Sequence, residues 1–280
     1  MVIKVETTIL AATNFSPVAN NSVIYAAGLA GAIGARLLLF HSFITPNHSD
    51  KEALFVASED SRFDNAVKRL DTLSNDIEKT FKINVSPACS RCHLEDHLSL
   101  VLRENNVALI VMGMAANTFE QDLWGNPTTL VFRNINLPLL SLPLSSKFLT
   151  TRKVLFAIDN NKVLRAQKIV WLRNVLKAVN GTVLFLCINK KIEKIRGTAP
   201  HLSQIDMIGT GFNEINYDFR DWFSSEVIEE IKLDITALEA DILGIGSLKS
   251  GFWDSIIHKS KTRVMLSRLN KPLLSLPNYP

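Results

Sequence analysis

The sequence has few cysteines and no long apolar run. Only three cysteines occur among 280 residues, too few for a disulfide framework and typical of a reducing compartment. The longest apolar stretch, Ala26 to Ala35, is rich in glycine and too short to span a bilayer. Residues 1–6 lack the apolar run of a signal peptide. We therefore expect a cytoplasmic protein with no membrane partner.

Strong charge of one sign is also missing. The formal net charge is +4, and 21% of the residues are charged. The densest basic cluster, residues 190–196, is short and typical of a solvated loop, so no nucleic-acid partner is expected. A hydrophobic fraction of 47% argues against disorder, and the length suits two ordinary domains.

What the sequence does contain is an internal repeat. The segment 136–143, NLPLLSLP, returns as NKPLLSLP at 270–277, with seven of eight positions identical. A second match, Ile9 to Asn14 against Val154 to Asp159, opens each half. The chain therefore reads as two copies of one domain fused head to tail. The predicted boundaries are 1–144 for the first domain, 145–152 for a polar linker and 153–280 for the second domain.

Apolar runs of strand length alternate with helical segments in both halves. Such runs are typical of strands buried on both faces of a parallel sheet. Ser16 and Pro17 have the residue types of a helix N-cap and a first helical position. The strands are expected at 8–13, 36–41, 83–89, 108–113, 138–142, 154–158, 182–188, 212–219, 241–246 and 272–276. The helices are expected after Pro17 and at 49–79, 95–105, 127–134, 162–179 and 225–238.

This alternation predicts an α/β fold with two tandem doubly wound, Rossmann-like parallel sheets of five strands each. The closing strands, Pro138–Leu142 and Pro272–Leu276, are apolar and end each sheet. Because an unpaired sheet edge invites pairing, we expect these strands to meet and the halves to pack as an intramolecular pseudo-dimer. A further homodimer and an unknown protein partner remain open.

A ligand pocket is expected where the strand order reverses, between the loops after the first and fourth strands. In the first half these loops are Thr13–Ser16 and Gly113–Asn117. A glycine at a strand end lets backbone approach a ligand closely. Gly125 and Asn126 precede a helix and form either a phosphate-binding start or a plain turn with an N-cap. His41, near the end of the second strand, is either a pocket residue or a structural histidine.

These features together resemble the universal stress protein family in its tandem form, which belongs to the adenine-nucleotide α-hydrolase-like group. The resemblance covers essentially the whole chain. It implies a stress-response module that binds ATP or another adenine nucleotide, with magnesium, or that has lost its cofactor. The implied first-half site comprises Ala12, Thr13, Asn14, Ser42, Gly113, Met114, Ala116, Gly125, Asn126 and Pro127.

The chain departs from the nucleotide motif of the family. Ala116 stands where a second glycine is usual, Asn126 replaces a hydroxyl residue, and Asn14 replaces an aspartate. Gly125 comes one residue early. The first half thus resembles a partly eroded nucleotide site.

The second half departs differently, because it keeps the aspartate as Asp159 and the first glycine as Gly246 but has lysine in the phosphate loop. Its weaker implied pocket comprises Ala157, Ile158, Asp159, Gly246, Lys259 and Ser260.

A cysteine and histidine cluster offers a separate hypothesis. Cys89, Cys92, His93 and His97 have types and spacings able to hold zinc. A strand-end cysteine followed by exposed histidines is the plainer interpretation. We expect no catalytic residues, because neither phosphate loop has an apparent base, nucleophile or metal set beside it. The alternatives are a slow ATP hydrolase or nucleotide-dependent enzyme of the same fold group, or a zinc or thiol sensor.

Overall fold

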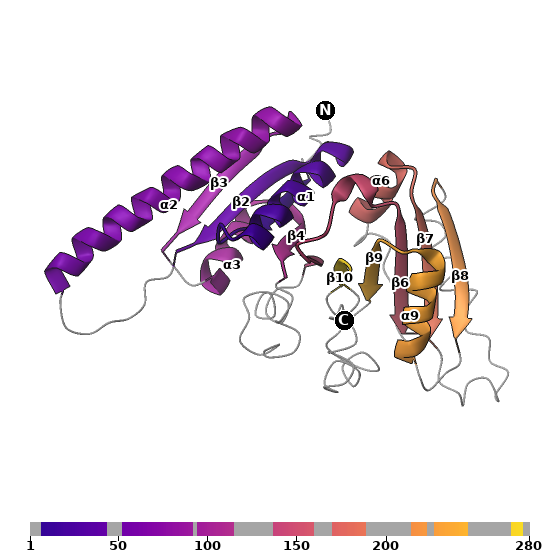
Figure 1. Cartoon of the computed structure of the whole chain (residues 1–280). Helices are drawn as coiled ribbons and strands as arrows, with labels where there is room; N and C mark the ends of the chain where they lie inside the picture. The colour runs from indigo at the N-terminus through magenta and orange to yellow at the C-terminus, as the bar shows by residue number, and fades with distance from the viewer. Residues whose placement is uncertain are drawn as a thin grey trace.

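The computed structural model describes residues 7–43, 52–91, 94–114, 137–159, 170–188, 214–222, 227–245 and 270–276. Ten strands form one sheet in the order β3-β2-β1-β4-β5-β10-β9-β6-β7-β8 (Figure 1). Each half contributes five strands in the same internal order, with β1 or β6 at the centre. All neighbouring strands within a half are parallel. The α/β class and doubly wound order predicted from the sequence are confirmed, and the two expected sheets are joined into one.

The first half begins with a strand whose five residues are all buried, as its continuous apolar sequence predicts. Its first helix starts at the Ser16 cap, whose Oγ accepts from the Ala19 N–H, and ends at Gly34 with φ 65°. The elements are β1 (Thr8–Ala12), α1 (Pro17–Ile33), β2 (Arg36–Ser42), α2 (Glu52–Phe81), β3 (Val85–Ser90), α3 (Leu94–Glu104), β4 (Val107–Gly113) and β5 (Leu139–Leu142).

The second half repeats this order after a short 3-10 turn, η1 (Phe148–Thr150). Its elements are β6 (Lys153–Asp159), α6 (Val170–Ala178), β7 (Thr182–Ile188), β8 (Asn216–Trp222), α9 (Val227–Leu238), β9 (Ile242–Ile245) and β10 (Leu273–Ser275). Most boundaries differ from expectation by one to three residues, and the largest difference is at β8, which begins four residues later than the predicted strand at 212–219. The helix expected at 127–134 and the first half of the one expected at 162–179 lie outside the described residues.

The two halves meet through β5 and β10, which pair antiparallel. Leu140 faces Leu274, Ser141 faces Leu273, and Leu139 faces Ser275. Because Leu140 and Leu274 are the same position of the repeat, the local two-fold axis passes between them. The sheet therefore changes from parallel to antiparallel only at this junction.

The core differs between the two faces of the sheet. On the face covered by α1, α2 and α6, one apolar cluster runs through both halves and includes residues such as Val23, Leu140, Leu274 and Leu172. On the opposite face each half has its own cluster, under α3 in the first half and under α9 in the second. Figure 1 shows α2 lying along β3 and α9 crossing in front of β6 and β7.

The segment expected as a polar linker is packed against α1. The Tyr25 hydroxyl hydrogen-bonds with Thr151 Oγ1 at 2.8 Å, and Asn21 Nδ2 donates to the Ser146 carbonyl at 3.1 Å. The Phe148 ring lies so close to Gly28 that a Cβ there would be 2.5 Å from its Cδ1. Ser146 and Thr151 are buried. This segment therefore adds a fixed layer over α1.

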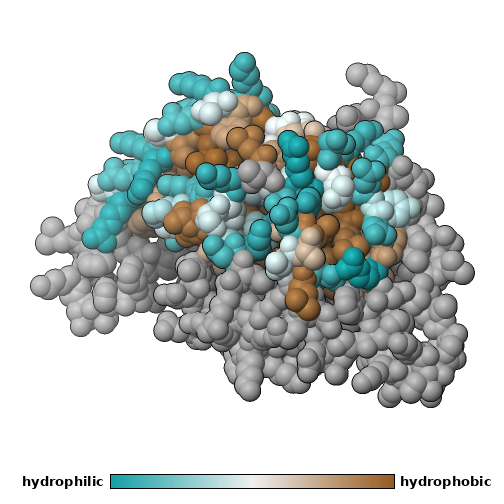
Figure 2. Space-filling view, turned by 45° about the vertical axis from the view of Figure 1, so that its right-hand side comes forward, coloured by the Kyte–Doolittle hydropathy of each residue, from teal (hydrophilic) through white to brown (hydrophobic). Residues whose placement is uncertain are grey.

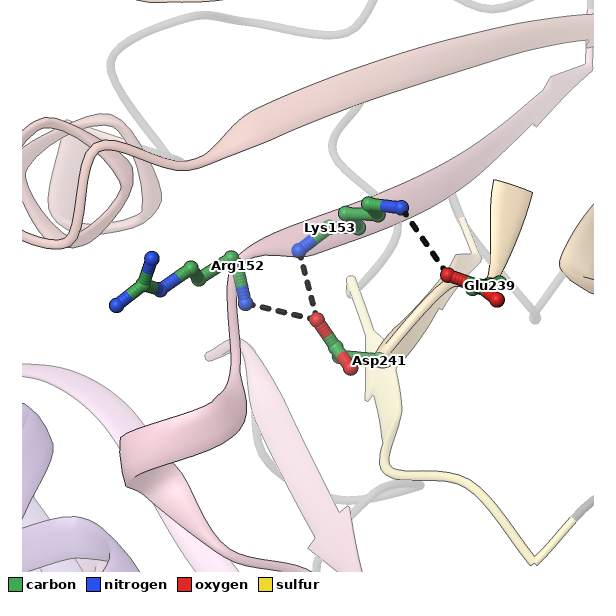
Figure 3. Close-up of polar contacts among 4 residues, drawn as sticks. All are labelled: Arg152, Lys153, Glu239 and Asp241. Carbon is green, nitrogen blue, oxygen red and sulfur yellow. Dashed lines mark hydrogen bonds and ion pairs between the residues drawn. The ribbon is translucent and has the colours of Figure 1, made fainter.

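At its far end the same segment is tied to the second half by Asp241 (Figure 3). One carboxylate oxygen, Oδ2, accepts from the Arg152 N–H at 2.8 Å and from the Lys153 N–H at 2.9 Å. The Lys153 side chain reaches Glu239 at 3.5 Å, in a largely exposed ion pair that stabilises little. Asp241 thus satisfies two backbone donors where β6 begins, at the amino end of the sheet.

The two edge strands, β3 and β8, carry features that disfavour pairing with a further strand. Pro87 interrupts the row of backbone donors in the edge strand β3, and β8 carries charged residues at the other edge.

Figure 2 shows apolar residues gathered in patches between polar side chains. Two exposed leucines, Leu100 on α3 and Leu233 on α9, are 54% and 64% exposed.

No helix among the described residues is long and apolar enough to cross a membrane.

Candidate nucleotide site

The candidate site of the first half lies at the carboxyl ends of β1 and β4, where the strand order reverses. Ala12 pairs with Met112, so Thr13 continues beside Gly113 at the end of β4, and the Met114 N–H donates to the Leu142 carbonyl at 2.8 Å. The Thr13 N–H donates to the Phe40 carbonyl at 2.8 Å. The structure therefore brings Ala12, Thr13, Asn14, Gly113 and Met114 to one edge.

Gly113 is required at this edge by a close approach of backbone. A Cβ at this position would lie 2.7 Å from the carbonyl oxygen of Val18 and 3.0 Å from the amide nitrogen of Ala19. The sequence predicts that the missing side chain lets a ligand approach the backbone, whereas the structure shows that it lets the first turn of α1 approach. This glycine thus has a packing role independent of any ligand.

The loop after β1 is held by its own polar side chains. Thr13 Oγ1 accepts from the Phe15 N–H at 2.9 Å, and Asn14 Oδ1 accepts from the Ser16 N–H at 3.1 Å. Asn14 is exposed, whereas Thr13 is buried. These local turns set the backbone that leads into the Ser16 cap of α1.

His41 supports this loop from the neighbouring strand. Its Nδ1 lies 2.8 Å from the Thr13 carbonyl, which fixes a proton on Nδ1 and orients the ring. The imidazole also packs against the Phe15 ring, with centroids 4.6 Å apart. Of the two roles open from the sequence, the structure favours a histidine that positions the loop. Ser42 follows it at the end of β2, half-buried and opposite Ser90.

Helix α2 closes the β2 and β3 side of this edge through aromatic and arginine contacts. Arg69 lies over the Phe15 ring at 4.5 Å, and Arg91 lies over the Phe63 ring at 4.3 Å. Phe63 meets Phe43 edge to face at 5.8 Å. Each of the three strands β1, β2 and β3 is thus followed by a residue that contacts α2.

These contacts were not found from the sequence. Phe15 was noted only as part of the loop, and nothing near Phe63 or Arg69 distinguishes them from other residues of a polar helix. The aromatic residues that follow β1 and β2 are the only local signal for these contacts, because a phenyl ring close behind a buried strand needs another side chain to pack against.

The chain matches the model of the universal stress protein family over residues 7–143. The first half of the chain is therefore a domain of the universal stress protein family. A comparison with curated protein sequences finds no match.

Solved structures extend the likeness in fold over both halves. A universal stress protein from Archaeoglobus fulgidus DSM 4304 has a TM-score of 0.67 at 13% identity, covering 97% of this chain and 96% of that one. The cytoplasmic domain of a prokaryotic cation chloride cotransporter has a TM-score of 0.54 at 10% identity, with 98% and 96% covered. A universal stress protein in complex with cAMP shares 19% identity over 50% of this chain and 98% of that one, with a TM-score of 0.36. At these identities the first two structures show the fold alone.

Several predicted site residues lie outside the described residues. In the first half these are Ala116, Gly125, Asn126 and Pro127. In the second half they are Gly246, Lys259 and Ser260.

The remaining second-half residues are Ala157, Ile158 and Asp159. They end β6, whose register with β9 and β7 matches that of β1 with β4 and β2. Asp159 therefore takes the strand position that corresponds to Asn14. These assignments to a nucleotide pocket stay predictions.

The cysteine cluster gains no support from its environment. Cys89 is half-buried in β3, and burial raises the pKa of its thiol above the usual value, which disfavours the thiolate that binds metal or reacts. Cys92, His93 and the His97 side chain lie outside the described residues. Cys187 is buried in the core. Among the described residues, no group of three or more possible ligands is placed to hold a metal.

Proposed function

We propose that this chain is a non-enzymatic stress-response protein of the cytoplasm, whose first half holds an adenine nucleotide. The family and the fold support the stress-response role. The nucleotide is proposed for the open edge beside Thr13, Asn14, Gly113 and Met114. The observation that carries this proposal is the geometry of that edge, which lies at the strand-order reversal, where α2 is the described helix that covers its β2 and β3 side.

The residue types at this edge support binding without catalysis. The segments 13–16, 41–43 and 113–114 contain no carboxylate, so the described ends of β1, β2 and β4 offer no acidic ligand for a magnesium ion and no carboxylate base. The one histidine there, His41, is already used to hold the Thr13 carbonyl. Function would then come from ligand occupancy and protein contacts.

We further propose that the two halves act as a pseudo-dimer. The antiparallel β5–β10 pairing and the shared apolar cluster on the α1 and α6 face support a single rigid unit. A protein partner would bind this unit with a different affinity when the first-half site is occupied.

Calorimetric titration of ATP with magnesium tests the nucleotide site, after the purified protein has been checked for carried-over nucleotide. We expect binding in the micromolar range with one site per chain. Met114→Trp should abolish it, because an indole beside Gly113 fills the open edge. Leu149→Trp, at a position 89% exposed in η1, is the matched control and should bind normally. Absence of both binding and bound nucleotide in the unaltered protein would overturn the proposal.

A further inference from the structure

The most unusual backbone at the candidate site belongs to Phe15. Its φ of 62° lies in the left-handed region, which a bulky side chain rarely adopts. The conformation is held by two bonds, from the Phe15 N–H to Thr13 Oγ1 at 2.9 Å and from Asn20 Nδ2 to the Phe15 carbonyl at 3.5 Å. Strain of this kind persists where the surrounding structure fixes it, and it concentrates at functional sites.

The result of this conformation is a stack of three side chains from three different elements. Phe15 packs against His41 at a centroid distance of 4.6 Å, and the Arg69 guanidinium lies 4.5 Å from the Phe15 ring centroid. The phenyl ring is thus already in contact with both a histidine and a guanidinium. Its effect is to hold the guanidinium of Arg69 at the rim of the site.

Arg69 carries a positive charge that no ion pair within the described part of the chain neutralises. Among the described residues, no carboxylate forms an ion pair with it, whereas the similar Arg91 is paired with Asp60 at 2.6 Å. Arg69 is also exposed, so its guanidinium can be reached from solvent. Segments 13–16, 41–43 and 113–114 contain no carboxylate, and Asp60, which lies at the β3 end of this edge, is paired with Arg91. The rim beside Arg69 therefore favours an anion.

We propose that Arg69 binds the phosphate group of the ligand in the first-half site, an inference that rests on the proposed nucleotide function. A guanidinium that lies on an aromatic ring keeps its N–H edge outward, and that edge matches the oxygens of a phosphate in a bidentate geometry. Phe15 and His41 act as positioning residues that fix the cation.

The test compares ATP, AMP, adenosine and inorganic tripolyphosphate as titrants for the unaltered protein and for Arg69→Ala. We expect ATP to bind more tightly than adenosine, and Arg69→Ala to weaken ATP and tripolyphosphate about 10- to 100-fold, as the loss of a charge-assisted bond implies. Adenosine binding should be unchanged. Lys68→Ala is the matched control, because it removes an equal charge from the residue that precedes Arg69 in α2. All four affinities should stay within about twofold of those of the unaltered protein.

Positioning by Phe15 has its own readout. Phe15→Leu removes the aromatic surface under the guanidinium, so ATP affinity should fall while adenosine affinity stays. Equal loss of ATP and adenosine in this variant would contradict the positioning role. Circular dichroism and a melting curve for each variant show whether the fold is kept. Arg69→Lys keeps the charge but not the planar bidentate guanidinium, so it should recover only part of the affinity.

The outcomes separate this inference from the proposed function. If ATP and adenosine bind equally and Arg69→Ala changes neither, the phosphate role of Arg69 is wrong and nucleoside binding stands. If neither ATP nor adenosine binds but tripolyphosphate binds and is lost in Arg69→Ala, the anion site stands without the adenine function. If tripolyphosphate also fails to bind, both are overturned.

Discussion

Leu140 of β5 lies directly opposite Leu274 of β10, and each leucine is its own half's copy of the same repeat position. Both side chains are fully buried in the cluster that runs through both halves. The contact is therefore where the two-fold axis of the chain and the shared core coincide.

Leu140→Ala and Leu274→Ala should each lower the free energy of unfolding by about 2–5 kcal/mol, because each leaves a cavity in a fully buried core. The two values should be similar, since the sites are related by the two-fold axis. Urea denaturation measures them, with Leu149→Ala at the 89% exposed position of η1 as control. A loss for one leucine only would show that the halves do not share the core equally.

Tyr25→Phe should lower the free energy of unfolding by about 0.5–1.5 kcal/mol at neutral pH. The change removes a buried hydroxyl that bonds with Thr151 Oγ1 at 2.8 Å, while the Thr151 hydroxyl keeps a partner in the Lys147 carbonyl at 3.2 Å. Tyr217→Phe, at a residue 38% exposed, is the control and should change little.

The same variant tests a pH dependence. Burial raises the pKa of Tyr25 well above its ordinary value, with the charge of Asp241 adding to the rise and the Thr151 bond opposing it. The unfolded chain therefore ionises first, at a pKa of about 10. Stability linked to Tyr25 is fully present below that pH and is lost as the pH rises further. The unaltered protein should lose stability faster than Tyr25→Phe above pH about 10, and parallel curves would contradict this.

Phe156 and Gly244 pair across β6 and β9, where the first half has Ala11 and Val111 across β1 and β4. A Cβ on Gly244 would lie 2.3 Å from the Phe156 ring. Gly244→Val should cost about 1–3 kcal/mol by overpacking, and Phe156→Ala about 3–5 kcal/mol by leaving a cavity. The double variant rebuilds the first-half pair and should cost less than the sum of the two. Simple additivity in denaturation would argue against this exchange.

Arg220 and Asp234 pair between β8 and α9, where the first half has the apolar Ala88 and Val101. Asp234 is 6% exposed and Arg220 is 50% exposed by side chain, so the carboxylate depends on the pair more than the guanidinium does. Arg220→Ala should therefore cost about 1–3 kcal/mol. Adding Asp234→Val should recover most of that loss.

Lys177→Ala is the control for this ion pair. Its contact with Glu214 is exposed on both sides, so the free energy of unfolding should change by less than about 1 kcal/mol. An Arg220→Ala variant as stable as Lys177→Ala would show that the buried carboxylate does not need its partner.

The fold was predictable because the repeat and the buried strands both leave clear patterns. β1 is buried at every position, and its unbroken apolar sequence marked it as a central strand. The start of β8 was misplaced because Asn216, Tyr217 and Asp218 belong to an exposed edge strand, where alternation is weak and polar residues are tolerated.

The site was predictable only in part. Topology placed Thr13, Asn14 and Gly113 at one edge, since the carboxyl ends of parallel strands share an edge. The contact of Arg69 with Phe15 was beyond reach, because it joins a helix to a loop far away in the sequence and depends on the left-handed backbone at Phe15. The packing reason for Gly113 was missed as well, because it depends on how closely Val18 approaches.

The antiparallel junction between β5 and β10 has a consequence for how this protein responds to dilution. Two separate domains paired in this way would dissociate as their concentration falls, whereas here the short segment through η1 keeps the partner strand at an effective concentration of the order of millimolar. Each half always has its neighbour, however few molecules a cell contains. One half can therefore change its ligand-binding residues and still keep its place in the fold, because that place depends on the closing strand that it pairs with the other half.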